Sequence, residues 1–189
     1  MNALPNLDDK CGKYLTYRDF IECGETWRSL YIDNVPIQFE TYSALERLAV
    51  AVLDPVIDNF GEIQLTYGVA CLSLTRRIDK RIAPRLDQHA GHELSANGTP
   101  ICDRGGVACD FEVGGVDSLT VAKWLVGNTD FDRLYYYEKD RPIHVSSAAV
   151  TKGQIVRVIR KANSQRMRPS VISRLDFLNL NIEDEEIAK

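Results

Sequence analysis

The sequence has no long apolar run and no excess of positive charge. No stretch approaches the roughly eighteen consecutive apolar residues of a membrane span. The beginning of the chain, MNALPNLDDKCGKYL, lacks the basic segment and apolar stretch of a secretory signal. We therefore expect a cytoplasmic protein with no membrane partner. The formal net charge of -4 offers no general attraction for nucleic-acid phosphates, so only the basic segment 152–174 is a candidate for nucleic-acid contact.

The cysteines are odd in number and form no motif. The 5 cysteines are scattered, and no two of them form C-x-x-C, which is typical of reduced thiols rather than of a disulfide framework. The sequence also has no internal repeat and no low-complexity segment. A chain of 189 residues suffices for one domain with a buried core. We expect this domain at residues 1–150, with residues 151–189 as a C-terminal extension that holds one more strand and a charged tail.

Apolar periodicity predicts a mixture of helices and strands. Apolar residues that recur every three or four positions indicate helices, and alternation indicates half-buried strands. Helices are expected at residues 15–25, 41–60 and 117–126. Strands are expected at residues 63–68, 107–113, 134–137, 142–147 and 155–160. Pro55 is expected to kink or divide the second helix, and residues 27–36 are expected to be an extended connection. These elements predict an α+β fold, with helices packed on a small, mostly antiparallel sheet.

The residues that could carry chemistry are concentrated between residues 87 and 144, which contain all three histidines. His89 and His92 stand in DQHAGHE, Asp110 stands in GGVACDF, and His144 stands in RPIHVS. Histidine is a common zinc ligand, and a catalytic zinc typically takes three protein side chains and leaves a fourth position for water. Two histidines and an aspartate would meet that need.

Two short motifs carry a family resemblance. Residues 106–110, GVACD, match G-x-A-x-D, and residues 143–146, IHVS, match a second histidine block. Their combination resembles the hedgehog/DD-peptidase fold, which includes the peptidase M15-like zinc D-alanyl-D-alanine carboxypeptidases. The resemblance covers roughly residues 41–147. It implies a zinc ion (Zn²⁺) held by Asp110, His144 and one further ligand, and it implies cleavage of an amide bond.

The further ligand has two candidates. When the family motif is aligned without gaps, its first histidine falls on Asp103, in ICDRGG. Alternatively, Asp87-Gln88-His89 matches S-x-H with Asp in place of Ser, followed by an insertion at residues 90–103. Such an insertion can form a loop because the entropic cost of a loop grows slowly with its length. We predict His89, with Asp103 as the alternative, and His92 as a second alternative or as a partner of a ligand.

The resemblance also implies a carboxylate general base shortly before the second histidine. Glu138 precedes His144 by six residues, and Asp140 precedes it by four. We predict Glu138 as the catalytic base, with Asp140 as the alternative. The family arginine that holds a substrate carboxylate has no counterpart in residues 66–70; Arg76 and Arg77 are the nearest possible substitutes.

Two functions follow from these features. The first is a zinc-dependent hydrolase of a small peptide or amide, resembling a DD-carboxypeptidase. The second is a non-catalytic metal-binding or accessory module that retains the fold. The N-terminal run LTYRDFIECGET resembles a domain that accompanies bacterial DNA-modification or phage-defence systems, and such a system would be the setting of the second function.

Overall fold

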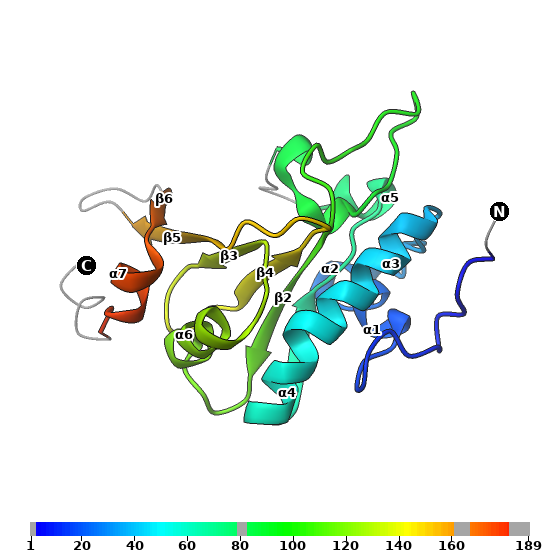
Figure 1. Ribbon diagram of the computed structural model, residues 1–189. Coiled ribbons are helices and arrows are strands. Elements are labelled where there is room, and N and C mark those ends of the chain that lie inside the picture. Colours follow the sequence, from blue (N-terminus) through cyan, green and yellow to red (C-terminus); the bar gives the residue numbers. More distant parts are fainter. Residues whose placement is uncertain (1–2, 79–82, 161–166, 182–189) are drawn as a thin grey trace.

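The computed structural model describes residues 3–78, 83–160 and 167–181, which form an α+β fold around one six-stranded sheet (Figure 1). The strand order is β1-β2-β4-β3-β5-β6. The strands are β1 (Ile63–Tyr67), β2 (Val107–Val113), β3 (Arg133–Tyr136), β4 (Ile143–Ser147), β5 (Gln154–Arg160) and β6 (Met167–Ile172). The α-helices are α1 (Tyr17–Ile21), α2 (Glu25–Leu30), α3 (Phe39–Leu48), α4 (Asp54–Phe60), α5 (Leu72–Thr75), α6 (Ser118–Asn128) and α7 (Arg174–Leu178).

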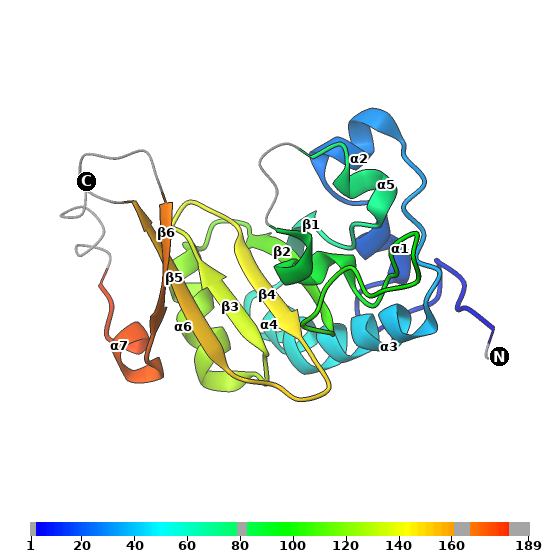
Figure 2. The same ribbon diagram turned by 90° about the horizontal axis from the view of Figure 1, so that it is seen from above.

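The two faces of the sheet carry different residues. Phe111, Leu134 and Val145 are fully buried on the face that packs against the helices. There α3 contacts β2 and β4, and α6 contacts β2 and β3; Figure 2 looks onto the sheet with α4 and α6 behind it. Because successive side chains of a strand point to opposite faces, Asp110 and His144 project from the other face.

The sheet is mixed, which corrects the expectation of a mostly antiparallel sheet. The predicted hairpin is present as β3 and β4, and β1, β2 and β4 also pair antiparallel. β5, however, pairs parallel with β3. After β4 the chain crosses the end of β3 and returns on the far side of it. Since β4 runs antiparallel to β3, a strand that reverses direction after β4 must run parallel to β3.

The helix expected at residues 41–60 forms, and Pro55 changes its winding. A π-helical segment, η1 (Ala49–Leu53), joins α3 to α4, and Asp54 N–H donates to the carbonyl of Ala49. Pro55 has no N–H, and its ring would contact the carbonyl four residues earlier in a regular α-helix. The wider turn just before Pro55 relieves that contact. The helix then ends at Gly61, whose φ of 88° lies in the left-handed region.

The N-terminal part of the chain contains one predicted and one missed helix. The helix expected at residues 15–25 is α1, which begins after Thr16, and the Thr16 side chain caps it by accepting from the N–H of Asp19. The prediction of an extended connection at residues 27–36 is wrong at its start, because α2 runs from Glu25 to Leu30. None of the α2 residues is buried, so there was no apolar periodicity from which to predict this helix.

Gly106, the first residue of the GVACD motif, sets the start of β2. Its φ is 72°, and a Cβ atom built on it would lie 2.0 Å from the backbone oxygen of Ser147. Only glycine allows this close approach. The close approach of Gly106 to Ser147 brings Val107 opposite Ser147. The resulting register between β2 and β4 places Asp110 directly opposite His144.

We therefore expect the Gly106→Ala variant to be strongly destabilised. A side chain in the left-handed region costs about 1–2 kcal/mol, and the overlap with Ser147 must in addition push β2 and β4 apart. The free energy of unfolding from urea titrations should fall by more than about 2 kcal/mol. Gly114→Ala is the matched control, because its φ is not in that region and nothing lies near its Cβ position. Equal unfolding midpoints for the two variants would contradict this role of Gly106.

The segment after residue 150 adds β5, β6 and α7 to the same sheet and core. Ile155 and Phe177 belong to the main hydrophobic cluster of the described residues, and Phe177 packs edge-on against Tyr136. Part of the predicted basic segment, residues 161–166, and most of the charged tail, residues 182–189, lie outside the described residues. Within the described ranges, no helix is long and apolar enough to cross a membrane.

Candidate metal centre

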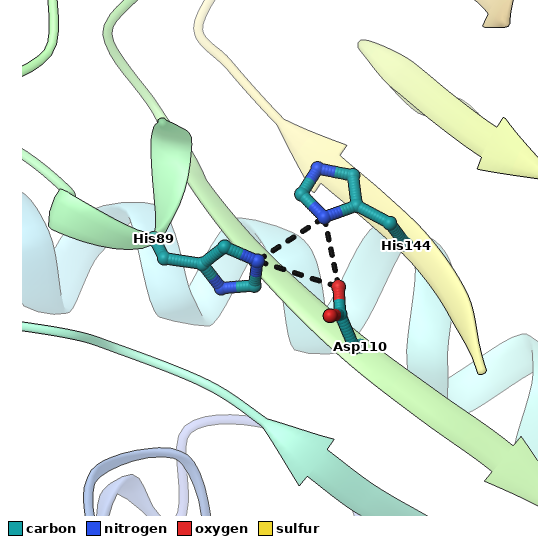
Figure 3. A group of neighbouring side chains, drawn as sticks. All are labelled: His89, Asp110 and His144. Atoms are coloured by element: carbon teal, nitrogen blue, oxygen red, sulfur yellow. Dashed lines mark hydrogen bonds and ion pairs between the residues drawn. The ribbon is translucent and has the colours of Figure 1, made fainter. Parts of the chain in front are cut away.

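Three side chains from separate parts of the sequence converge on the open face of the sheet. Asp110 lies in the middle of β2, and His144 lies directly opposite it on β4. His89 lies on the short 3-10 helix η3 (Gln88–Ala90) and points at both of them (Figure 3). The structure thus brings together the three residues that the sequence predicted as candidate ligands, with His89 in the third position. Together they form a group that could hold a metal ion.

The distances within this group match the needs of a small tetrahedral ion. His89 Nε2 lies 3.1 Å from His144 Nδ1 and 3.3 Å from Asp110 Oδ1, and the latter two atoms are 2.8 Å apart. Bonds of about 2.0–2.1 Å at tetrahedral angles separate ligand atoms by about 3.3 Å. The three atoms therefore need to move by no more than about half an ångström to hold a zinc-sized ion.

The orientation of His89 directs an electron pair into the site. Its Nδ1 lies 2.8 Å from the carbonyl oxygen of Gly68, and a carbonyl only accepts, so Nδ1 carries the proton. In the neutral ring, Nε2 is then left with a lone pair. That lone pair faces the carboxylate of Asp110. Two electron-pair donors in contact require a positive charge between them, either a proton or a metal ion.

Gly68 is suited to this carbonyl contact. A Cβ atom built on Gly68 would lie 2.1 Å from the backbone oxygen of Phe20, so only glycine allows β1 to approach the end of α1 this closely. A carbonyl that accepts from a ligand histidine holds the ring in one tautomer and one orientation. The sequence-based prediction did not include Gly68, because its role depends on contacts with residues far away in the sequence.

The charges in the group support one another. Burial would raise the pKa of Asp110, but the adjacent His89 and His144 outweigh it and hold that pKa below its usual value. Burial opposes protonation of His89, yet Asp110, Asp87 and the Gly68 carbonyl together raise its pKa above the usual value. Both pKa shifts arise because the carboxylate and the imidazoles lie close together, and such a group attracts positive charge. The Asp110 side chain is 26% exposed, whereas the two histidines are buried, so solvent reaches the site from the side of Asp110.

Tyrosines flank the group on both sides. A β-bulge between Leu65 and Tyr67 brings Tyr67 opposite Asp110. Without the extra residue Thr66, Tyr67 would point into the core, because a shift of one residue exchanges the faces of a strand. The Tyr67 ring lies 4.2 Å from that of His89, and Tyr135 packs edge-on against His144 at 5.1 Å. The sequence-based prediction missed both tyrosines. The bulge that turns Tyr67 leaves no periodic signal, and Tyr135 lies opposite His144 only because β3 pairs with β4 in this register.

The other predicted residues lie outside the group. Asp103 is exposed, and its carboxylate is 3.1 Å from Nε of Arg85. Glu138 and Asp140 lie in the turn between β3 and β4, where Arg141 N–H donates to the carbonyl of Glu138. Neither belongs to the group of three potential ligands among the described residues.

The remaining histidine and cysteines have structural surroundings. His92 Nε2 accepts from the backbone N–H of Gly106, at 3.2 Å, so His92 contacts the start of β2 rather than the metal site. Cys109 is buried on the core face of β2, next to Asp110 in sequence but on the other side of the sheet. Burial raises the pKa of the Cys109 thiol well above its usual value. All five cysteines are free.

Arg76 and Arg77, the predicted substitutes for the missing family arginine, are both exposed at the end of α5. A different arginine contacts one of the tyrosines that flank the group. Arg104 is half-buried, and its Nη1 donates to the hydroxyl of Tyr135 at 3.1 Å.

Comparison of the chain with protein-family models, with curated proteins and with solved structures found no match.

Proposed function

We propose that the chain is a zinc-dependent hydrolase of small peptides or amides. The observation that carries the proposal is the convergence of His89 Nε2, Asp110 Oδ1 and His144 Nδ1 on one point, with separations of 2.8–3.3 Å. Two histidines and one carboxylate are a ligand set found in catalytic zinc sites, where three protein ligands leave one position open. The partial exposure of Asp110 supports an open position on that side.

In this proposal each residue of the site has a defined task. A bound zinc ion would supply polarisation of the substrate carbonyl and a lowered pKa for an attacking water. Asp110 and the two histidines hold the ion, and the Gly68 carbonyl keeps His89 in the required tautomer. Glu138 takes the proton from the attacking water and passes it to the leaving amine. Asp140 is the alternative base.

A second function, a non-catalytic metal-binding module, is favoured by one observation. Glu138 and Asp140 are not part of the ligand group, and Asp140 is exposed. A site without a carboxylate in reach of the attacking water would bind metal and perform no hydrolysis. On this second proposal the metal would hold the fold in a form that an accessory partner recognises, for example in a bacterial DNA-modification or phage-defence system.

Hydrolysis with and without metal distinguishes these functions. The zinc-loaded protein is incubated with D- and L-configured dipeptides and with muropeptides, and released amines are quantified by mass spectrometry. We expect cleavage of at least one substrate class, loss of cleavage after removal of the metal by a chelator, and recovery when zinc is added back. If the protein with one zinc per chain cleaves none of these substrates, the hydrolase proposal fails for them and the accessory module is supported.

A further inference from the structure

The third ligand is held differently from the other two. Asp110 and His144 are positioned by the hydrogen-bond ladder between β2 and β4. His89 instead lies on a single turn of 3-10 helix that ends at Gly91, with a φ of 59°. Figure 3 shows this turn beside β2 and not as part of the sheet. Other contacts must therefore fix the place of His89 relative to its partners.

Gln88, the residue before His89, is anchored in the sheet by its side chain. It is 1% exposed. Its Nε2 donates to the carbonyl of Gly105 at 2.9 Å and to Oδ2 of Asp132 at 3.0 Å, and its Oε1 accepts from Nη1 of Arg133 at 3.3 Å. Both amide hydrogens and the amide oxygen thus have partners. A side chain with three directional bonds fits in only one orientation.

Two partners of Gln88, Asp132 and Arg133, form a buried ion pair that makes further hydrogen bonds to the segment around β5. Asp132 and Arg133 are adjacent in sequence, are nearly inaccessible to solvent, and contact each other through Oδ2 and Nη1. Asp132 Oδ1 accepts from the N–H of Lys152 at 3.1 Å, and Arg133 Nε donates to Gln154 Oε1 at 3.3 Å. The network therefore joins η3 to β3 and to the start of β5, which belongs to the C-terminal extension.

Stability alone does not account for this network. Replacing a buried ion pair by packed apolar residues is often neutral or stabilising, because charged groups lose their hydration on burial. A network in which every member is satisfied instead specifies one arrangement of the parts that it joins. Here those parts are the turn that bears His89 and the sheet that bears the other two ligands.

We propose that Gln88, held by Asp132 and Arg133, is a positioning residue that places His89 Nε2 at the metal site. The proposal rests on the assignment of His89, Asp110 and His144 as ligands, and it does not depend on whether the protein is a hydrolase. It also gives the C-terminal extension a task, because Lys152 and Gln154 complete the network.

The test is the Gln88→Leu variant, which keeps a side chain of similar size and removes all three hydrogen bonds. Replacement of residues outside the ligand set that orient the ligands typically changes metal affinity by about 10–100-fold. We expect the zinc dissociation constant of Gln88→Leu, measured by competition with a chromophoric chelator, to rise by about that factor. The visible absorption bands of the cobalt-substituted protein should also change, because they report the geometry of the ligands.

The matched control is Gln64→Leu, the same change at an exposed position of β1, which should alter neither the affinity nor the cobalt spectrum. If Gln88→Leu does not fold, Arg133→Lys is the second variant. It retains the charge beside Asp132, but a single amine cannot also reach Gln88 and Gln154, so a smaller loss of affinity is expected.

The outcomes separate this proposal from the proposed function. Wild-type affinity and an unchanged cobalt spectrum in folded Gln88→Leu and Arg133→Lys would overturn the positioning role, whatever the catalytic activity. A wild-type protein that binds zinc but hydrolyses nothing would overturn only the enzyme proposal. A wild-type protein that binds neither zinc nor cobalt would overturn both.

Discussion

The Asp110→Ala and His144→Ala variants are expected to lose bound zinc while remaining folded. Structural zinc in zinc-finger peptides binds with about 10–16 kcal/mol of free energy at neutral pH, which gives a scale for this site. If three ligands share this evenly, loss of one weakens binding by on the order of a hundred- to ten-thousandfold. Both side chains lie on the open face of the sheet, and the core on the other face contains neither. Elemental analysis after dialysis should find well below one zinc per chain, with an unchanged far-ultraviolet circular dichroism spectrum.

The same measurement decides between the two candidates for the third ligand. His89→Ala should lose zinc like the first two variants. Asp103→Ala is the matched control, because this carboxylate is exposed and pairs with Arg85, and it should retain one zinc per chain. If Asp110→Ala and His144→Ala both retain one zinc per chain, the proposed metal centre is wrong. If His89→Ala retains zinc and Asp103→Ala loses it, Asp103 is the third ligand.

The second large effect is expected for Glu138→Gln. The amide has nearly the shape of the carboxylate but cannot accept a proton from the attacking water. Loss of a positioned general base typically lowers the rate by about a hundred- to ten-thousandfold. We therefore expect kcat for amide hydrolysis to fall by that factor, while zinc content and thermal unfolding remain those of the wild type. The rates are measured on whichever substrate the wild-type protein cleaves.

Asp140→Asn is the control for this experiment, because Asp140 is exposed two residues further along the same turn. It should retain most of the activity. Full activity in Glu138→Gln would show that the base lies elsewhere, and a strong loss in Asp140→Asn alone would assign the role to Asp140. Equal, small losses in both variants would argue that neither carboxylate takes the proton.

Much of the local structure could be predicted from the sequence. Strand β2 has the predicted bounds, Val107–Val113, and the helix expected at residues 117–126 is α6, capped by Asp117. Such elements are predictable because a periodic apolar pattern and a capping side chain act over a few neighbouring residues. Where the pattern was absent, as in α2, the prediction failed.

The candidate ligands were also accessible from the sequence, for a different reason. The chain has three histidines and two motifs at a suitable distance, so few sets of three metal ligands were possible. The GVACD and IHVS segments pair in register, so Asp110 and His144 meet across neighbouring strands. Since β2 and β4 are separated by a helix and a third strand, the sequence could suggest this pairing only through the motifs.

The sequence by itself therefore determined which segments with a clear apolar period form helices or strands, and which side chains are able to bind a metal. Only the tertiary structure decided that β5 runs parallel to β3, that a bulge turns Tyr67 towards His89, and that the Gly68 carbonyl and Gln88 hold the third ligand. Gln88 and Arg133 are 45 positions apart, and His89 and His144 are 55 apart. Contacts of this kind depend on how whole elements pack, because the chain between them has no local pattern that specifies which distant group it will meet.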